Sequence, residues 1–194
     1  MKKFYFLILF ASVFTNTVQA QNTTAKKLNW GYKIGINGSN LRIEDGADAN
    51  WKTGLATGLF FNIKLANKLS LQPEVLYSSM GARNVVNGSG SLRLNYFSLP
   101  VMAKYKVCKN FSVLAGPQMD MLIQAKTKSS SNQLSKVTND YNESSFNLTG
   151  GAEYWPVHCF GFSARYIYGL NDVAGFDRIE MKNQGVQLMA AVKF

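Results

Sequence analysis

The chain has 194 residues and a formal net charge of +10, and charged residues make up only 16% of it. This length fits one domain. No apolar run after the first twenty residues is long enough to cross a membrane as a helix. Lysines and arginines are scattered along the chain and not gathered on one stripe, so nucleic acid is not an expected partner.

The first twenty residues have the pattern of a secretory signal peptide. Lys2 and Lys3 precede an apolar run at 4–14, and Val18-Gln19-Ala20 forms a small-residue cleavage site. The apolar run is too short to serve as an uncleaved helical membrane anchor. The sequence therefore predicts a cleaved signal at 1–20, a short N-terminal segment at 21–29 and one domain at 30–194. Loss of Lys2 and Lys3 lowers the net charge from +10 to +8.

Alternation of apolar and polar residues dominates the rest of the chain. In the first segment, Tyr32, Ile34 and Ile36 alternate with Lys33 and Asn37. Eight such segments occur, at 30–39, 54–65, 69–80, 92–106, 111–125, 145–155, 160–170 and 184–194. Their period of two predicts strands, and segments of about ten residues suit tilted membrane-spanning strands.

Two features disturb this pattern. Alternation slips near Asn95 and Tyr96, which predicts a β-bulge. Pro73, Pro100 and Pro117 lie inside three segments, where proline removes a backbone donor from the ladder. We therefore expect local breaks in the ladders at these prolines.

The connections between the segments alternate in length. Long polar connections lie at 40–53, 81–91, 126–144 and 171–183, and tight ones lie at 66–68, 107–110 and 156–159. Outer-membrane barrels have short periplasmic turns and long extracellular loops. This rhythm predicts an all-β fold, an eight-stranded antiparallel up-and-down transmembrane β-barrel with both termini in the periplasm.

The last segment supports a closed barrel. It is an apolar alternating strand that stops at Phe194. In a soluble protein, such an exposed edge would template aggregation, whereas a closed barrel has no edge.

Volume decides which face of the barrel is apolar. The interior of an eight-stranded barrel is only just wide enough for side chains to fill it. The bulky apolar face cannot fit there, whereas the face rich in Gly, Ala, Ser and Asn can. We therefore expect the apolar face to contact lipid, with aromatic girdles at both interfaces. The predicted girdle residues are Trp30, Tyr105, Tyr154, Trp155, Phe160 and Phe194 near the turns, and Tyr77, Phe97, Phe146 and Tyr168 near the loops.

Four charged residues are predicted to point into the lumen near the turns: Glu74, Lys104, Glu153 and Arg165. Buried charges are costly unless they are paired. We expect a network in which Arg165 lies between Glu153 on the adjacent strand and Glu74 across the barrel. Lys33, Lys64, Asp120 and Lys193 are candidates to extend it. A structural plug is the favoured interpretation, and a gated polar pore or a proton-sensitive site is the alternative.

The sequence offers little for catalysis or for metal binding. Cys108 and Cys159 both lie in predicted short turns, so a disulfide between them is one hypothesis. The single histidine, His158, has no neighbours at the spacing of a catalytic or metal motif. We expect no catalytic residue, no metal and no cofactor.

Several stretches resemble the porin-like outer-membrane β-barrel domain family, which includes PorT-type proteins and OmpA-like eight-stranded barrels. They are LSLQPEVLYS at 69–78, FSLPVMAKYK at 97–106, FSVLAGP at 111–117 and ARYIYGL at 164–170. Ser98 stands where an acidic residue usually precedes the Leu-Pro of the fourth strand. The resemblance implies a barrel inserted by the outer-membrane assembly machinery, which would read the terminal aromatic strand that ends at Phe194. It also implies outer-membrane lipids as the surroundings of the barrel and no catalytic residues.

Three functions are compatible with this sequence. The leading hypothesis is a non-enzymatic barrel of the bacterial outer membrane, with a structural, adhesive or secretion-accessory role through the loops at 40–53 and 126–144. The second is a narrow transport pore through the lumen. The third is a soluble periplasmic lipid-binding barrel, in which the apolar face would point inward.

Overall fold

The computed structural model describes residues 29–43, 50–83, 91–128, 134–136, 142–172 and 181–194. The predicted signal peptide at 1–20 and most of the segment at 21–29 lie outside these residues. The strands are β1 (Asn29–Ile43), β2 (Asn50–Lys64), β3 (Leu69–Arg83), β4 (Ser91–Lys106), β5 (Phe111–Lys128), β6 (Leu134–Lys136), β7 (Ser144–Tyr154), β8 (Phe160–Gly169) and β9 (Met181–Lys193).

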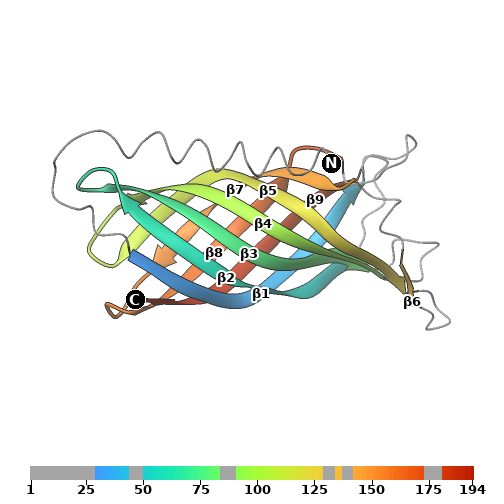
Figure 1. Ribbon diagram of the computed structural model, residues 1–194, viewed down its shortest axis with the longest axis horizontal. Coiled ribbons are helices and arrows are strands. Elements are labelled where there is room, and N and C mark those ends of the chain that lie inside the picture. Colours follow the sequence, from blue (N-terminus) through green and yellow to red (C-terminus); the bar gives the residue numbers. More distant parts are fainter. Residues whose placement is uncertain (1–28, 44–49, 84–90, 129–133, 137–141, 173–180) are drawn as a thin grey trace, which may run out of the picture.

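Eight long antiparallel strands close into a barrel (Figure 1). Neighbours along the chain pair as hairpins, and the first strand, β1, pairs with the last, β9, to complete the cylinder. The three-residue strand β6 lies antiparallel beside the last residues of β5 and, among the described strands, pairs only with β5. The predicted eight-stranded barrel is confirmed. In the described part of the chain, no helix is long and apolar enough to span a membrane.

Strand ends agree with the predicted segments to within four residues. The differences are largest on the loop side, where β1, β2, β3, β5 and β9 continue into segments predicted as loops. Alternation of hydrophobicity weakens there because those residues lie past the apolar band, where polar side chains can occupy the outer face as well. Periodicity therefore located the membrane-spanning part of each strand and missed its extension.

Each strand proline lies at a break in one ladder, as predicted. In the β2–β3 ladder the register passes from Phe60↔Glu74 to Ile63↔Leu71, so Pro73 has no partner on β2. Pro73 instead pairs with Val101 on β4. Pro100 lacks a partner on β3 and Pro117 lacks one on β4, in the same way. The barrel thus accommodates the missing N–H groups in three adjacent strands.

A β-bulge lies at the predicted place. The β4–β5 register shifts between Asn95 and Tyr96, and the extra residue, Ile123, belongs to β5. A second irregularity separates Trp51 from Ala56 on β2. Beside it Gly81 has a φ of 137°, which favours glycine. The Ser39 hydroxyl accepts from the Gly81 N–H and donates to the Gly81 carbonyl, so these backbone groups are satisfied.

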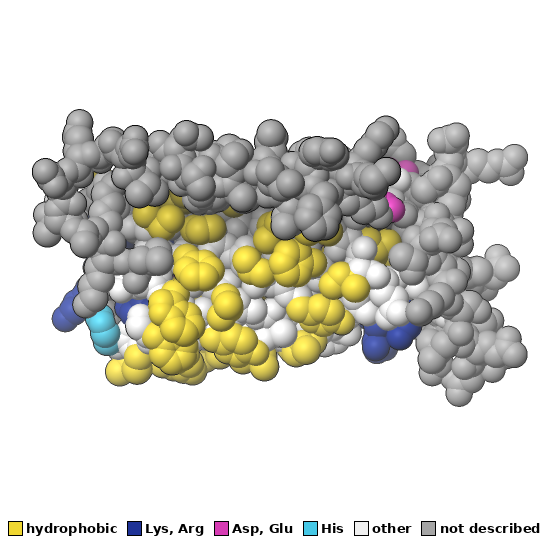
Figure 2. Space-filling view, in the orientation of Figure 1, with side chains coloured by type: hydrophobic (Ala, Val, Ile, Leu, Met, Phe, Trp, Pro, Cys, Tyr) yellow, Lys and Arg dark blue, Asp and Glu magenta, His cyan; other side chains and the backbone are white. Residues whose placement is uncertain are grey.

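In the middle of the barrel the outer face is apolar, and the charged side chains of the strands point into the lumen. Ile34 and Leu188 are each 49% exposed, whereas Glu74 and Arg165 are each 2% exposed. Strand β8 shows strict alternation of buried and exposed residues. This is the predicted membrane arrangement, and it is the reverse of a soluble lipid-binding barrel, whose apolar face would line the interior. Figure 2 shows apolar side chains over the described middle of one face, with basic side chains at both ends.

The turn-side aromatic girdle is present with one correction. Trp30, Tyr105, Tyr154 and Phe194 are exposed, and the Trp30 and Phe194 rings lie 4.7 Å apart. Trp155 was predicted to belong to this girdle, and that prediction is wrong. It follows the end of β7, where the strict alternation no longer applies, and its ring turns inward to within 6.1 Å of the Phe60 ring.

Charge on the lipid-facing surface tests the orientation of the barrel. We expect Ile34→Arg to lower the free energy of unfolding by about 2–4 kcal/mol, because Ile34 lies midway along the outward apolar face. Urea titration of the protein folded into phospholipid vesicles measures this change. The control, Thr53→Arg near the loop end, is expected to cost less than about 1 kcal/mol. Equal effects at the two positions would contradict the assigned membrane band.

Candidate functional site

A network of buried charges crosses the lumen in its turn-side half. Lys33 Nζ lies 2.8 Å from Glu74 Oε1 and 2.6 Å from Glu153 Oε1. Arg165 binds Glu74 through two nitrogens, each at 2.6 Å, and approaches Glu153 at 3.4 Å. The parallel bonds from Arg165 to Glu74 have the fork geometry of strong charge-assisted pairs. Arg165 thus lies between Glu153 on the adjacent strand and Glu74 across the barrel.

Three further side chains complete this lumen network. Lys104 Nζ lies 2.6 Å from Glu153 Oε2. The Gln72 amide donates to both Glu74 and Glu153, at 2.8 Å each, and its oxygen accepts from Lys104. The Trp155 indole N–H donates to Glu153 at 3.2 Å. Gln72 was not predicted, because an inward amide in a strand has no distinctive sequence signal.

Barrel closure brings these groups together from five strands. Glu74 on β3 and Arg165 on β8 are 91 residues apart in sequence and fully buried. Each side chain lies on the inward face of its strand, as the period of two requires. Lys33 was predicted only as an extension, yet it lies at the centre, bonded to both carboxylates. Three cations therefore share two carboxylates. Each charged side chain has a partner of opposite sign, and the network as a whole carries one net positive charge.

A second polar layer includes Asp120, which does not join the charge network. The Asp120 carboxylate accepts from Gln118 at 2.9 Å and from Asn147 at 2.7 Å. Gln118 in turn accepts from the Thr149 hydroxyl at 3.0 Å. Elsewhere in the lumen Asn37 bonds Ser78 and Gln187. Asp120 is thus held by neutral amides, and the hypothesis that it extends the ion pairs does not match this geometry.

The loop-side end of the lumen is apolar, which the sequence analysis did not anticipate. The buried cluster, here called the apolar plug, contains Leu41, Met80, Ala82, Leu92, Leu94, Tyr96, Ala125 and Ile167. Tyr96 places its hydroxyl 3.1 Å from the Asn183 amide nitrogen. The expectation of a small, polar interior is therefore wrong at this end. It is only partly right lower in the barrel, where Leu76, Met102 and Met189 are also buried.

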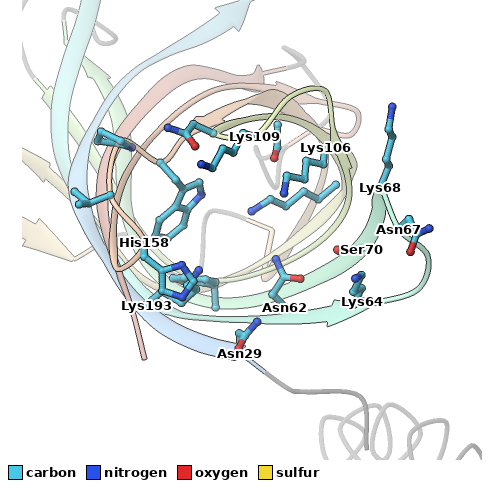
Figure 3. A pocket seen from close by; sticks show the side chains of 17 residues that line it. Asn29, Asn62, Lys64, Asn67, Lys68, Ser70, Lys106, Lys109, His158 and Lys193 are labelled. Carbon is cyan, nitrogen blue, oxygen red and sulfur yellow. The ribbon is translucent and has the colours of Figure 1, made fainter. Parts of the chain in front are cut away.

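The turn-side end of the lumen opens into a cavity of about 620 Å³ (Figure 3). We call it the periplasmic cavity, because short turns of outer-membrane barrels face the periplasm. Lys64 and Lys193, both predicted as extensions of the network, line this cavity instead. Lys193 Nζ lies 5.3 Å from the centre of the Trp155 ring, a cation–π distance.

The two cysteines do not form the hypothesised disulfide. Both thiols are free and exposed. Cys108 lies in the β4–β5 turn and Cys159 in the β7–β8 turn. The Cys159 carbonyl accepts a hydrogen bond from the Lys193 N–H at the end of β9. The two turns belong to neighbouring hairpins, because β5 pairs with β7. No group of three or more metal-ligating side chains occurs among the described residues.

Removal of one carboxylate tests the lumen network. We expect Glu74→Gln to lower the free energy of unfolding by about 3–5 kcal/mol, because Arg165 and Lys33 lose a buried partner. Urea titration in vesicles measures it. Lys106→Gln, an exposed control at the periplasmic cavity, should change stability by less than about 0.5 kcal/mol. A Glu74→Gln protein as stable as the parent would show that the network contributes nothing to stability.

Comparison with solved structures finds similar barrels. Ail, the attachment invasion locus protein of Yersinia pestis, has a TM-score of 0.56 at 18% identity over 86% of this chain and 98% of Ail. Neisserial surface protein A also has a TM-score of 0.56, at 12% identity over 85% of this chain and 97% of that protein. At these identities the likeness concerns the fold alone. Comparison with curated proteins finds no match.

The family match covers most of the chain. Residues 19–175 match the family described as outer membrane protein beta-barrel domain. The eight closed strands and the apolar outer face are the architecture that such a family requires. The chain therefore belongs to the outer-membrane protein β-barrel domain family.

Proposed function

We propose that this protein is a non-enzymatic barrel of the bacterial cell surface that acts in adhesion through its extracellular end. The observation that carries this proposal is the closed lumen. The charge network fills the turn-side half, and the apolar plug fills the loop-side end. Eight strands leave no width for a water-filled channel beside such side chains. A barrel whose lumen does not conduct presents its two ends as the surfaces for binding other molecules.

The strands on the extracellular side support this role. A tilted strand needs about 9–11 residues to cross the bilayer, whereas β4 has 16 residues and β5 has 18. The hairpin of β5 with β6 projects beyond the barrel at the end opposite the C-terminus (Figure 1). The protein therefore presents ordered strand surface outside the membrane.

Four basic residues lie at the extracellular strand ends, where Glu143 and Asp172 of the adjoining connections also lie. We call the outward residues Arg42, Arg83, Arg93 and Lys126 the basic collar. Arg93 and Lys126 are Cα partners on adjacent strands. Like charges in directly opposed positions repel, so an anion placed between them would relieve that repulsion. Sulfate or phosphate groups of surface polysaccharides have the required charge.

One similar structure gives an example of this ligand class. Ail has also been solved in complex with the heparin analogue sucrose octasulfate, with a TM-score of 0.53 and 18% identity to this chain, over 86% of this chain and 99% of Ail. For the present chain, sulfated polysaccharide is a proposed ligand class, supported by the charge of the collar.

Binding of heparin tests the collar. We expect the double variant Arg93→Gln/Lys126→Gln, displayed on intact cells, to bind heparin about tenfold more weakly, because two charge-assisted contacts are lost. The matched control Lys106→Gln/Lys109→Gln removes the same charge from the periplasmic end, which heparin added to intact cells does not reach, and should retain the parent affinity. Equal loss in both variants would mean that heparin senses net charge only, and the collar would lose its proposed role.

A narrow transport pore is the second candidate, favoured by the charged side chains that line the lumen. Conductance across a planar bilayer separates the two candidates. We expect no stable open state of the parent protein, because the apolar plug closes the extracellular end. A steady conductance that disappears in Arg165→Gln would favour the pore and overturn the proposal of a closed barrel.

A further inference from the structure

We propose that the periplasmic cavity is a binding site for an anion that carries several phosphate charges. The cavity lies at the end opposite the basic collar, so this site is separate from the proposed adhesive surface. Its volume of about 620 Å³ falls in the range of small-molecule sites. The lumen network closes its inner end, so it is a blind cavity that opens only toward the turns.

The charge of the cavity is one-sided. Six lysines line it, and none of its described lining residues is Asp or Glu. They are Lys64, Lys68, Lys104, Lys106, Lys109 and Lys193. Figure 3 shows Lys106, Lys109 and Lys193 around a common opening at the end of the barrel. Lysine ammonium groups that share one concave space repel one another, and a multivalent anion would remove this repulsion.

One of these six lysines, Lys104, is paired with the lumen carboxylate Glu153, and the floor of the cavity separates the other five from it. The Trp155 ring packs on Gly161, where an added Cβ would lie 2.6 Å from the ring. The indole N–H and Lys104 both bind Glu153 Oε2, at 3.2 and 2.6 Å. Glu153 is 1% exposed and therefore has no accessible oxygen for Lys106 or Lys109. The carboxylate of Glu153 therefore does not neutralise Lys106 and Lys109.

The charge of the cavity suits phosphate better than carboxylate. A phosphate group carries about two negative charges on one compact centre, whereas a carboxylate carries one, so several of the lining lysines can bind the same phosphate. Lysine acts as a point charge that binds phosphate from any direction. The amides of Asn62, Asn67 and Asn110 supply further donors at the same opening. A soluble oligophosphate and a phospholipid headgroup of the inner leaflet share this chemistry.

Calorimetric titration with tripolyphosphate tests the proposal on the full barrel in zwitterionic detergent. We expect saturable binding at one site. Lys106→Gln/Lys109→Gln should weaken it about tenfold, because two charge-assisted contacts are lost. Both side chains are exposed at a turn, so the variant should fold, as checked by its mobility on unheated detergent gels. The control Lys128→Gln/Lys136→Gln removes the same charge from the extracellular ends of β5 and β6 and should bind like the parent.

Three results would overturn the proposal: no saturable binding, equal weakening in both double variants, or citrate bound as tightly as tripolyphosphate. The source of the phosphate is distinguished in nanodiscs. If phosphatidylglycerol in the disc weakens tripolyphosphate binding relative to phosphatidylcholine alone, a lipid headgroup occupies the cavity. If it does not, the site takes a soluble phosphate, and both results support a phosphate site.

Discussion

Pairing of β1 with β9 is the contact on which the rest of the structure depends. Thirteen Cα partners, from Gly31↔Lys193 to Ile43↔Met181, join the first strand to the last. Hydrocarbon offers no hydrogen-bonding groups, so every backbone N–H and C=O in the membrane must find a partner in the protein. Pairing between consecutive strands alone forms seven of the eight ladders and leaves β1 and β9 as open edges. Closure removes these edges and, by the same step, turns one face of every strand into the wall of a narrow lumen.

That narrow lumen explains why charged and apolar clusters coexist inside it. Glu74 and Arg165 are forced together by the small diameter, and at this separation they are favourable only because each has several partners. At the loop-side end, Leu, Met and Tyr side chains fill the lumen instead of ion pairs. The two clusters need different neighbours and lie at different depths. Both fill the lumen with side chains, by two chemically distinct means.

Periodicity predicted most of the fold and part of the site. The alternation of Tyr32, Ile34 and Ile36 with Lys33 was enough to place β1 and to orient it, because a lipid-facing strand must expose apolar residues at every second position. The pairing of Glu74 with Arg165 followed from the cost of buried charge. Trp155 could not be placed, since it follows the last regular residue of β7, where the period of two no longer constrains direction. The central position of Lys33 depends on barrel stagger, which local sequence does not encode.

The distribution of charge follows from these constraints. Carboxylates in the lumen, Glu74 and Glu153, are fully engaged by Lys33, Lys104 and Arg165. The outer face in the bilayer excludes charge. Further basic residues of the described strands are thereby confined to the two ends, where Figure 2 shows basic side chains. The middle of the described barrel thus has an uncharged outer belt, and the turn-side end gathers lysines with no Asp or Glu among the described residues that line its cavity, so anions on the periplasmic side are the partners that its electrostatics favour.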